Sequence, residues 1–339
     1  MVKMYKMIFI NSMIAGTMIT ISSFSWISAW IGLEINLLSI MPLLKNKKNA
    51  YPAESALKYF ITQAMASSLL LFSVILSMNL NNIMIIKEFN MATMIIMSSA
   101  LLLKMGAAPF HFWFPEMISG LNWSNTMIML TWQKIAPMML ISYLVKTYTM
   151  FFSMIVISSS IISGLQGLNQ ICICKILAYS SINHVSWMIS SLFNSVYIWL
   201  FYFLTYSLIN LNIILIFKKF NVFYMKQLIN ILNYKKKVKF LFMMNFLSLG
   251  GLPPFLGFLP KWLTINNLIE NNHFTLTISL IMFTLISLYF YLRIVFSTFT
   301  INSEESLFHV FNKISYLHFM CNSLALFGLV MCSMMDMNY

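Results

Sequence analysis

Long apolar stretches separated by short polar breaks recur along the chain. An α-helix needs about 20 apolar residues to cross the hydrocarbon core of a bilayer. The pattern therefore predicts an all-α polytopic membrane protein, a single transmembrane domain with about eleven helices. The expected spans are about 7–24, 25–44, 53–78, 91–112, 123–147, 151–170, 174–194, 196–218, 238–268, 274–298 and 314–334.

Composition supports a membrane protein. The chain is 60% hydrophobic and only 9% charged, whereas soluble domains keep roughly a quarter of their residues charged. The net charge of +13 raises the possibility of nucleic-acid binding. The lysines lie in short loops between apolar spans, however, so no nucleic acid is expected as a partner. The four cysteines lack a CxxC or Cys/His ligand spacing, and we interpret them as packing residues rather than metal ligands.

The distribution of lysines predicts the orientation of the spans, because lysine-rich short loops stay on the side from which the chain is inserted. The N-terminus is expected on the lysine-rich side and the C-terminus on the opposite side. The opposite side receives only Lys87 and Lys146. The lysine-rich side receives Lys3, Lys6, Lys45, Lys47, Lys48, Lys175, Lys218, Lys219, Lys226, Lys235, Lys236, Lys237, Lys239 and Lys313.

Four ionisable residues lie well inside predicted spans: Glu34, Lys104, Lys134 and Lys261. A lysine at the centre of a bilayer costs about 2.5–3.5 kcal/mol on insertion scales, so several such residues in one chain indicate a function. The alternatives are a lysine near a span end whose ammonium group reaches the head groups and, for the glutamate, a position at a helix end.

Glycine and proline residues gather beside the three lysines and predict interruptions of the helices. Non-helical backbone at membrane depth persists only where it is buried in protein or lines water. Interrupted segments in corresponding positions of two halves indicate an ion path. Burial favours the neutral amine of lysine, which allows a proton to be taken up and released. We therefore interpret the four intramembrane charges as a proton relay. The expected helix breaks are at Gly106, Pro109, Pro137, Gly250, Gly251, Pro253 and Pro254.

Two histidines and one ion pair are lesser candidates. His111 and His184 are possible relay members, because imidazole titrates near neutral pH; packing between helices is an equally good interpretation. Glu54 and Lys58 stand four residues apart at the start of a span, which favours a local contact at a helix end.

Five segments carry a family resemblance: GLEINLLSIMPLL, ALLLKMGAAPFHFWFPE, TWQKIAP, LAYSSINHVSWM and NFLSLGGLPPFLGFLPKW. Together they resemble the subunit 2 family of mitochondrial NADH:ubiquinone oxidoreductase, respiratory complex I, particularly its insect-like members. The resemblance implies an antiporter-like inverted-repeat fold with discontinuous helices. It also implies that Glu34, Lys104, Lys134 and Lys261 form a central hydrophilic axis. The lysine-rich side would be the matrix, with the C-terminus in the intermembrane space.

The implied function is proton translocation across the inner mitochondrial membrane, coupled to electron transfer from NADH to ubiquinone in other subunits. NADH, FMN, iron–sulfur clusters and ubiquinone would belong to the complex, whereas this chain is expected to bind no cofactor or metal. Its expected partners are other membrane-arm subunits and lipids such as cardiolipin. A stand-alone cation/proton antiporter and a purely structural subunit are the alternatives.

Overall fold

The computed structural model describes residues 2–45, 50–83, 91–227, 236–253, 255–299 and 323. The expected span 314–334, apart from Ser323, and the expected break at Pro254 lie outside these residues. The chain divides into two compact units, Met1–Ile155 and Val156–Tyr339. We refer to them as the N-terminal unit and the C-terminal unit and describe each by itself.

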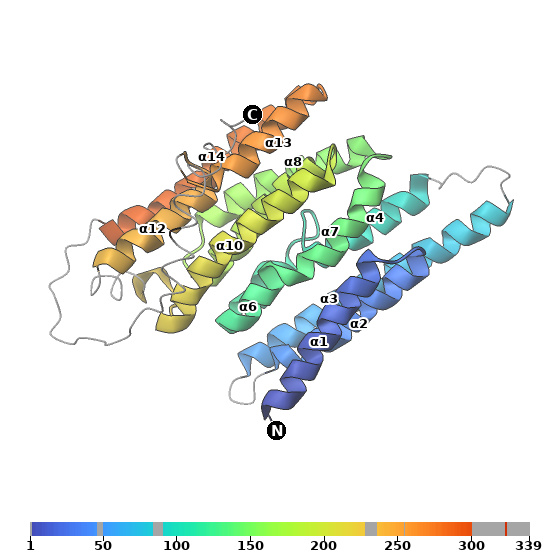
Figure 1. The fold of residues 1–339 in the computed structure, drawn as a ribbon, viewed down its shortest axis with the longest axis horizontal. Coiled ribbons are helices and arrows are strands. Elements are labelled where there is room, and N and C mark those ends of the chain that lie inside the picture. The colour runs from blue at the N-terminus through green and yellow to red at the C-terminus, as the bar shows by residue number, and fades with distance from the viewer. Residues whose placement is uncertain are drawn as a thin grey trace. The chain divides into compact units, whose positions relative to one another are not determined.

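Every named element of the described chain is an α-helix (Figure 1). The N-terminal unit contains α1 (Val2–Ile21), α2 (Trp26–Leu44), α3 (Tyr51–Ile83), α4 (Met91–Met105), α5 (Trp113–Ser119), α6 (Trp123–Leu130) and α7 (Trp132–Val145). The boundary between the units falls within α8 (Thr149–Leu168). The C-terminal unit continues with α9 (Ile173–Leu192), α10 (Val196–Phe220), α12 (Lys236–Gly250), α13 (Phe258–Glu270) and α14 (Phe274–Phe299).

The predicted all-α class and the discontinuous helices are confirmed. The expected span 91–112 ends as a helix at Met105, and the expected span 238–268 consists of α12 and α13 with non-helical backbone between them. The remaining single-helix spans in the described ranges agree with the predicted positions to within a few residues at most ends. Hydrophobic patterning therefore located the membrane-spanning helices, and glycine and proline located two of their interruptions.

The prediction of a helix break at Pro137 is wrong. Pro137 lies inside α7, and the interruption falls instead at Thr131, between α6 and α7. There the amide of Lys134 donates to the carbonyl of Thr131 at 3.2 Å. A proline removes one backbone hydrogen bond but does not end a transmembrane helix when neighbouring groups satisfy the freed carbonyl.

Packing in the N-terminal unit brings the polar parts of its helices together. α2 contacts α1 and α3, α3 contacts α4 and α5, and α7 contacts α1, α4 and α6. Side chains also tie helices to distant backbone: the indole of Trp30 donates to Ser67 O at 3.1 Å, and the amide of Asn125 donates to Leu43 O at 3.0 Å. These contacts hold α2, α4 and α7, the helices that carry Glu34, Lys104 and Lys134, in one packed body.

The C-terminal unit is built around α9. Every residue of α9 except Lys175 and Tyr179 is buried, and the helix contacts α10, α13 and α14. The orange and red helices α12 and α14 lie side by side in Figure 1. Arg293 of α14 donates to the carbonyls of Leu168 and Gln170 at 2.5 and 2.7 Å, so its guanidinium group binds carbonyls at the C-terminal end of α8.

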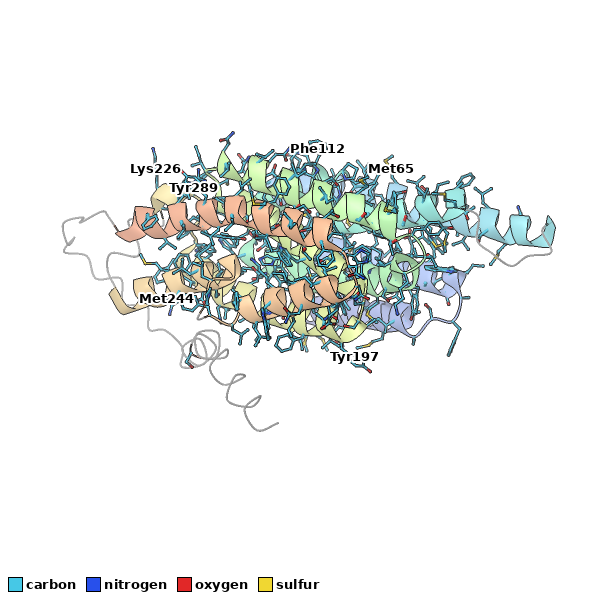
Figure 2. All side chains as sticks on the ribbon, turned by 90° about the horizontal axis from the view of Figure 1, so that it is seen from above. Met65, Phe112, Tyr197, Lys226, Met244 and Tyr289 are labelled. Atoms are coloured by element: carbon cyan, nitrogen blue, oxygen red, sulfur yellow. The ribbon has the colours of Figure 1, made fainter. Side chains whose placement is uncertain are left out.

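Both units expose many large apolar side chains. Within the described ranges, seven helices are long and apolar enough to cross a membrane. Figure 2 shows Met65 and Phe112 on the outside of the N-terminal unit and Tyr197 and Tyr289 on the outside of the C-terminal unit. Side chains of this kind are stable on a surface that faces hydrocarbon. The chain is therefore a multi-pass membrane protein.

Candidate functional site

The first helix break follows from the conformation of one glycine. α4 ends at Met105, and Gly106 adopts a left-handed backbone with φ +73°. The amides of Gly106 and Ala107 donate to Leu103 O and Leu102 O at 3.2 and 3.1 Å. These two bonds form a Schellman motif, the usual helix ending at a left-handed glycine.

The same glycine makes room for a ring that contacts Lys134. A Cβ atom at Gly106 would lie 3.0 Å from the Cβ of Phe114. The ammonium nitrogen of Lys134 lies 5.7 Å from the centroid of the Phe114 ring, within the range of a cation–π contact. Lys134 is only 2% exposed. The lysine is therefore buried in protein.

Lys104 is buried beside the first break and interacts with Glu34. It lies in the last turn of α4 and is 7% exposed, and it interacts electrostatically with Glu34 of α2. Glu34 Oε2 is buried and has no hydrogen-bond partner within the described chain. The backbone carbonyl of Lys104 accepts a hydrogen bond from Gln63 Nε2 at 3.2 Å. The structure thus brings together the glutamate and the first lysine of the predicted relay.

An amide network next to these charges was not predicted. Asn36 and Gln133 form a reciprocal pair, with Asn36 Nδ2 donating to Gln133 Oε1 at 3.1 Å and Gln133 Nε2 donating to Asn36 Oδ1 at 2.9 Å. The hydroxyl of Tyr59 also donates to Gln133 Oε1 at 3.3 Å. The sequence does carry a signal for this network. Asn36 and Gln133 are polar residues inside apolar spans and stand within two positions of Glu34 and Lys134, and such residues form hydrogen bonds between membrane helices.

His111 belongs to the loop that follows the first break. It is 1% exposed, and its Nδ1 lies 3.2 Å from Pro109 O. Its ring packs against Phe112 with the centroids 4.3 Å apart. The histidine therefore contacts neighbouring residues of its own loop. Its role in proton transfer stays a prediction.

The predicted pair of Glu54 and Lys58 is present and is larger than expected. The ammonium nitrogen of Lys58 lies 3.2 Å from Glu54 Oε1 and 3.1 Å from Glu116 Oε2. All three side chains are substantially exposed. This cluster ties α3 to α5, and exposed ion pairs of this kind contribute little to stability.

The second break, in the C-terminal unit, repeats the backbone geometry of the first. α12 ends at Gly250, and Gly251 has φ +77°. The amides of Gly251 and Leu252 donate to Ser248 O and Leu247 O at 3.0 and 3.3 Å. The spacing of the two bonds is the same as at the first break, so both units end a membrane helix with a Schellman motif.

The backbone at the second break binds the side chain of Lys261. The ammonium nitrogen of Lys261 donates to Gly250 O at 2.8 Å and lies 5.8 Å from the Trp187 ring. A Cβ at Gly251 would lie 2.7 Å from Lys261 Cδ, so only glycine leaves space for the lysine stem. The last carbonyls of α12 form the negative end of its dipole. Lys261, which is 7% exposed, is therefore stabilised by an interrupted helix.

His184 contacts a hydroxyl that the sequence did not point to. Its Nδ1 lies 2.9 Å from the hydroxyl of Tyr202, and its ring lies 4.9 Å from the ring of Tyr206. On the same helix, Asn183 Nδ2 donates to Ser287 Oγ at 3.0 Å. α9, α10 and α14 thus supply a buried polar cluster within an apolar unit.

The two breaks also correspond in sequence. GAAPFHFWFPE begins at Gly106 and GLPPFLGFLPK begins at Gly251. Glycine, proline, phenylalanine and a second proline recur at the same spacings, and the final positions are Glu116 and Lys261. The corresponding charges therefore differ in sign. They also differ in burial, since the Glu116 side chain is 59% exposed.

The predicted relay residues are divided between the units. Glu34, Lys104, Lys134 and His111 lie in the N-terminal unit, and the other two, His184 and Lys261, lie in the C-terminal unit. Each lysine is nearly enclosed by protein at or beside a helix interruption. Within the described ranges, no group of three His, Cys, Asp or Glu side chains is placed to hold a metal ion. The chemistry that this arrangement offers is proton binding by buried amines.

The fold and these sites define a class of protein: a polytopic membrane protein whose interrupted helices carry buried cations. Residues 23–287 match the family described as NADH:quinone oxidoreductase/Mrp antiporter, TM. The chain belongs to this family.

Curated relatives agree with the family assignment, and a solved structure shares the fold. The chain is 50% identical over 342 residues to NADH-ubiquinone oxidoreductase chain 2 of Anopheles gambiae, with 98% of each chain covered. It is 47% identical over 316 residues to the protein of the same name from Aedes aegypti, covering 93% of this chain and 92% of that one. A chain of respiratory complex I from Thermus thermophilus has the same fold, with a TM-score of 0.83 and 22% identity over 96% of this chain and 78% of that chain.

Proposed function

We propose that this chain translocates protons across the inner mitochondrial membrane as a membrane-arm subunit of NADH:ubiquinone oxidoreductase. Energy comes from electron transfer between NADH and ubiquinone in other subunits. The names of its relatives support the assembly. The N-terminus faces the matrix and the C-terminus the intermembrane space, as the lysine distribution favours. NADH, FMN and iron–sulfur clusters reside elsewhere in the complex.

One observation carries the proposal: three lysines are between 2% and 7% exposed inside membrane-spanning units. Each buried ammonium costs several kcal/mol in a bilayer. Lys134 faces an aromatic ring, Lys104 interacts with Glu34, and Lys261 binds a helix-end carbonyl. A scaffold has no use for such groups, whereas a proton carrier requires them. Glu34 modulates Lys104 through its charge in this proposal, and the lysines load and release protons.

Replacement of Lys134 by methionine tests the proposal. The change keeps the volume of the buried side chain and removes its charge, so the complex should assemble. NADH-driven proton pumping should fall severely, because a positioned proton-transfer group contributes about 100-fold or more. Lys6→Met is the matched control, since Lys6 is an exposed lysine of the same unit. Undiminished pumping in an assembled Lys134→Met complex would support a structural subunit instead.

A stand-alone cation/proton antiporter is distinguished by biochemistry. After gentle solubilisation, the chain should migrate with NADH:ubiquinone oxidoreductase activity in a large assembly. Recovery of the chain alone, active as an exchanger in vesicles, would contradict the proposed function.

A further inference from the structure

A cavity of about 520 Å³ lies in the N-terminal unit, and its lining includes none of the charged relay residues. The turn between α1 and α2, formed by Ser23, Phe24 and Ser25, provides one wall. Met94 of α4, three residues near the end of α7 and Thr147 beyond that end also line it. Ligand sites in proteins commonly have volumes of about 300–1,000 Å³, so the cavity is large enough for a ligand.

The cavity is apolar inside and open at its rim. Ala29, Leu140 and Leu144 are almost completely buried and line the interior. Phe24 and Tyr143 also line it, and both are highly exposed. An apolar cavity does not retain water, because water there lacks polar partners. Hydrocarbon is therefore the occupant that suits the interior.

The rim lies at the ends of membrane spans. The turn between α1 and α2 and the C-terminal end of α7 both form its edge. Trp26 and Tyr143 stand at this edge, and these two residue types are enriched where a membrane meets water. A molecule in the cavity would therefore place its apolar part toward the bilayer interior and its polar part at head-group level.

One cation stands beside the rim. Lys146 lies between the cavity residues Leu144 and Thr147 and is exposed. Within the described chain it forms no ion pair. The hydroxyls of Ser23 and Thr147 already donate to Thr20 O and Leu144 O at 2.8 and 2.7 Å. The ammonium group of Lys146 is thus the feature that distinguishes one head group from another.

We propose that this cavity binds an acyl chain of an anionic phospholipid whose phosphate group faces Lys146. Bilayer hydrocarbon is as apolar as the cavity, so the acyl chain alone gives no preference among lipids. One lysine at an anionic membrane surface supplies about a fivefold preference for the negative head group. The proposal depends on the cavity and on Lys146 and is independent of the proposed proton transfer.

Photo-crosslinking with two lipid probes tests this site in the intact, reconstituted assembly. One probe is phosphatidylglycerol with a diazirine in its acyl chain, and the other is phosphatidylcholine with the same chain. Crosslinked residues are mapped by mass spectrometry. We expect the anionic probe to label Ala29, Met94 and Leu140 about fivefold more than the neutral probe. Met65, exposed on α3, should be labelled equally by both and serves as the internal reference.

Three surface variants separate the head group from the cavity. Lys146→Gln should abolish the preference for phosphatidylglycerol, and Lys6→Gln, an exposed lysine at the opposite end of α1, should retain it. Thr147→Trp should block the rim and reduce labelling of the cavity by both probes. Equal labelling by the two lipids in the unmodified chain would overturn the proposal. Absence of any label in the cavity would also overturn it and would indicate that another protein covers this face.

Discussion

Gly251→Ala perturbs the second helix break, because the missing side chain of Gly251 is what leaves room for Lys261. The residue has φ +77°, a conformation that costs a residue with a Cβ about 1–2 kcal/mol. The new Cβ would lie 2.7 Å from Lys261 Cδ and 2.9 Å from its Nζ. Real Cβ atoms do not approach other atoms this closely, so the lysine must move.

The loss of stability can be estimated from the hydrogen bond that breaks when Lys261 moves. Lys261 Nζ donates to Gly250 O at 2.8 Å, and a hydrogen bond to a charged group contributes about 1.5–3 kcal/mol. Together with the backbone cost, the native arrangement of this break loses about 2.5–5 kcal/mol. A loss of this size should reduce the thermal stability of the subunit and displace the ammonium group from the helix end.

The neighbouring glycine supplies the control. A Cβ at Gly250 would lie 3.7 Å from Leu288 Cδ1, an ordinary van der Waals contact, and Gly250 lies in α12 without a left-handed φ. Gly250→Ala should therefore preserve stability and function. Both variants are compared in the intact complex by thermal unfolding and by NADH-driven proton pumping at equal assembly.

We expect Gly251→Ala to unfold at a lower temperature and to pump at least several-fold more slowly than Gly250→Ala. If the two variants unfold and pump alike, Lys261 does not depend on the helix break, and the geometric argument for this site fails.

Two further predictions concern side-chain contacts that the structure revealed. Tyr202→Phe removes the hydroxyl that lies 2.9 Å from His184 Nδ1 and should slow proton pumping in an assembled complex. Tyr197→Phe, at an exposed position of the same helix, should leave pumping unchanged, and equal pumping rates in the two variants would remove His184 from the proposed relay. In a double-mutant cycle of Asn36→Ala and Gln133→Ala, thermal unfolding should give a coupling energy of about 0.6 kcal/mol, the average for polar pairs between membrane helices. If the losses of stability in the two single variants simply add up in the double variant, the amide pair contributes nothing.

Much of the fold was predictable because the signals for it are local. A bilayer requires about 20 apolar residues per helix, and every long helix of the described chain lies where the hydrophobic pattern placed one. Gly106 and Gly251 marked helix ends, since a left-handed conformation strongly favours glycine. Pro137 misled the prediction, because a proline weakens a membrane helix without necessarily ending it.

The candidate sites were predictable only as types of residue. An ionisable side chain in an apolar span is visible in the sequence, and Glu34, Lys104, Lys134 and Lys261 were identified in this way. Side-chain pairs formed between distant segments of the chain were not predictable in this way. Asn36 and Gln133 are 97 positions apart, and Lys58 and Glu116 are 58 positions apart, so no local pattern connects them.

The sequence by itself thus determined that this protein crosses a membrane many times, which segments are helical, and which side chains are costly inside a bilayer. Tertiary structure decided what surrounds each costly side chain: the charge of Glu34 acts on Lys104, a phenylalanine ring faces Lys134, and a helix-end carbonyl binds Lys261. The physical reason is that burial in lipid constrains each residue separately, whereas a contact depends on the positions of two chain segments that are joined only through packing.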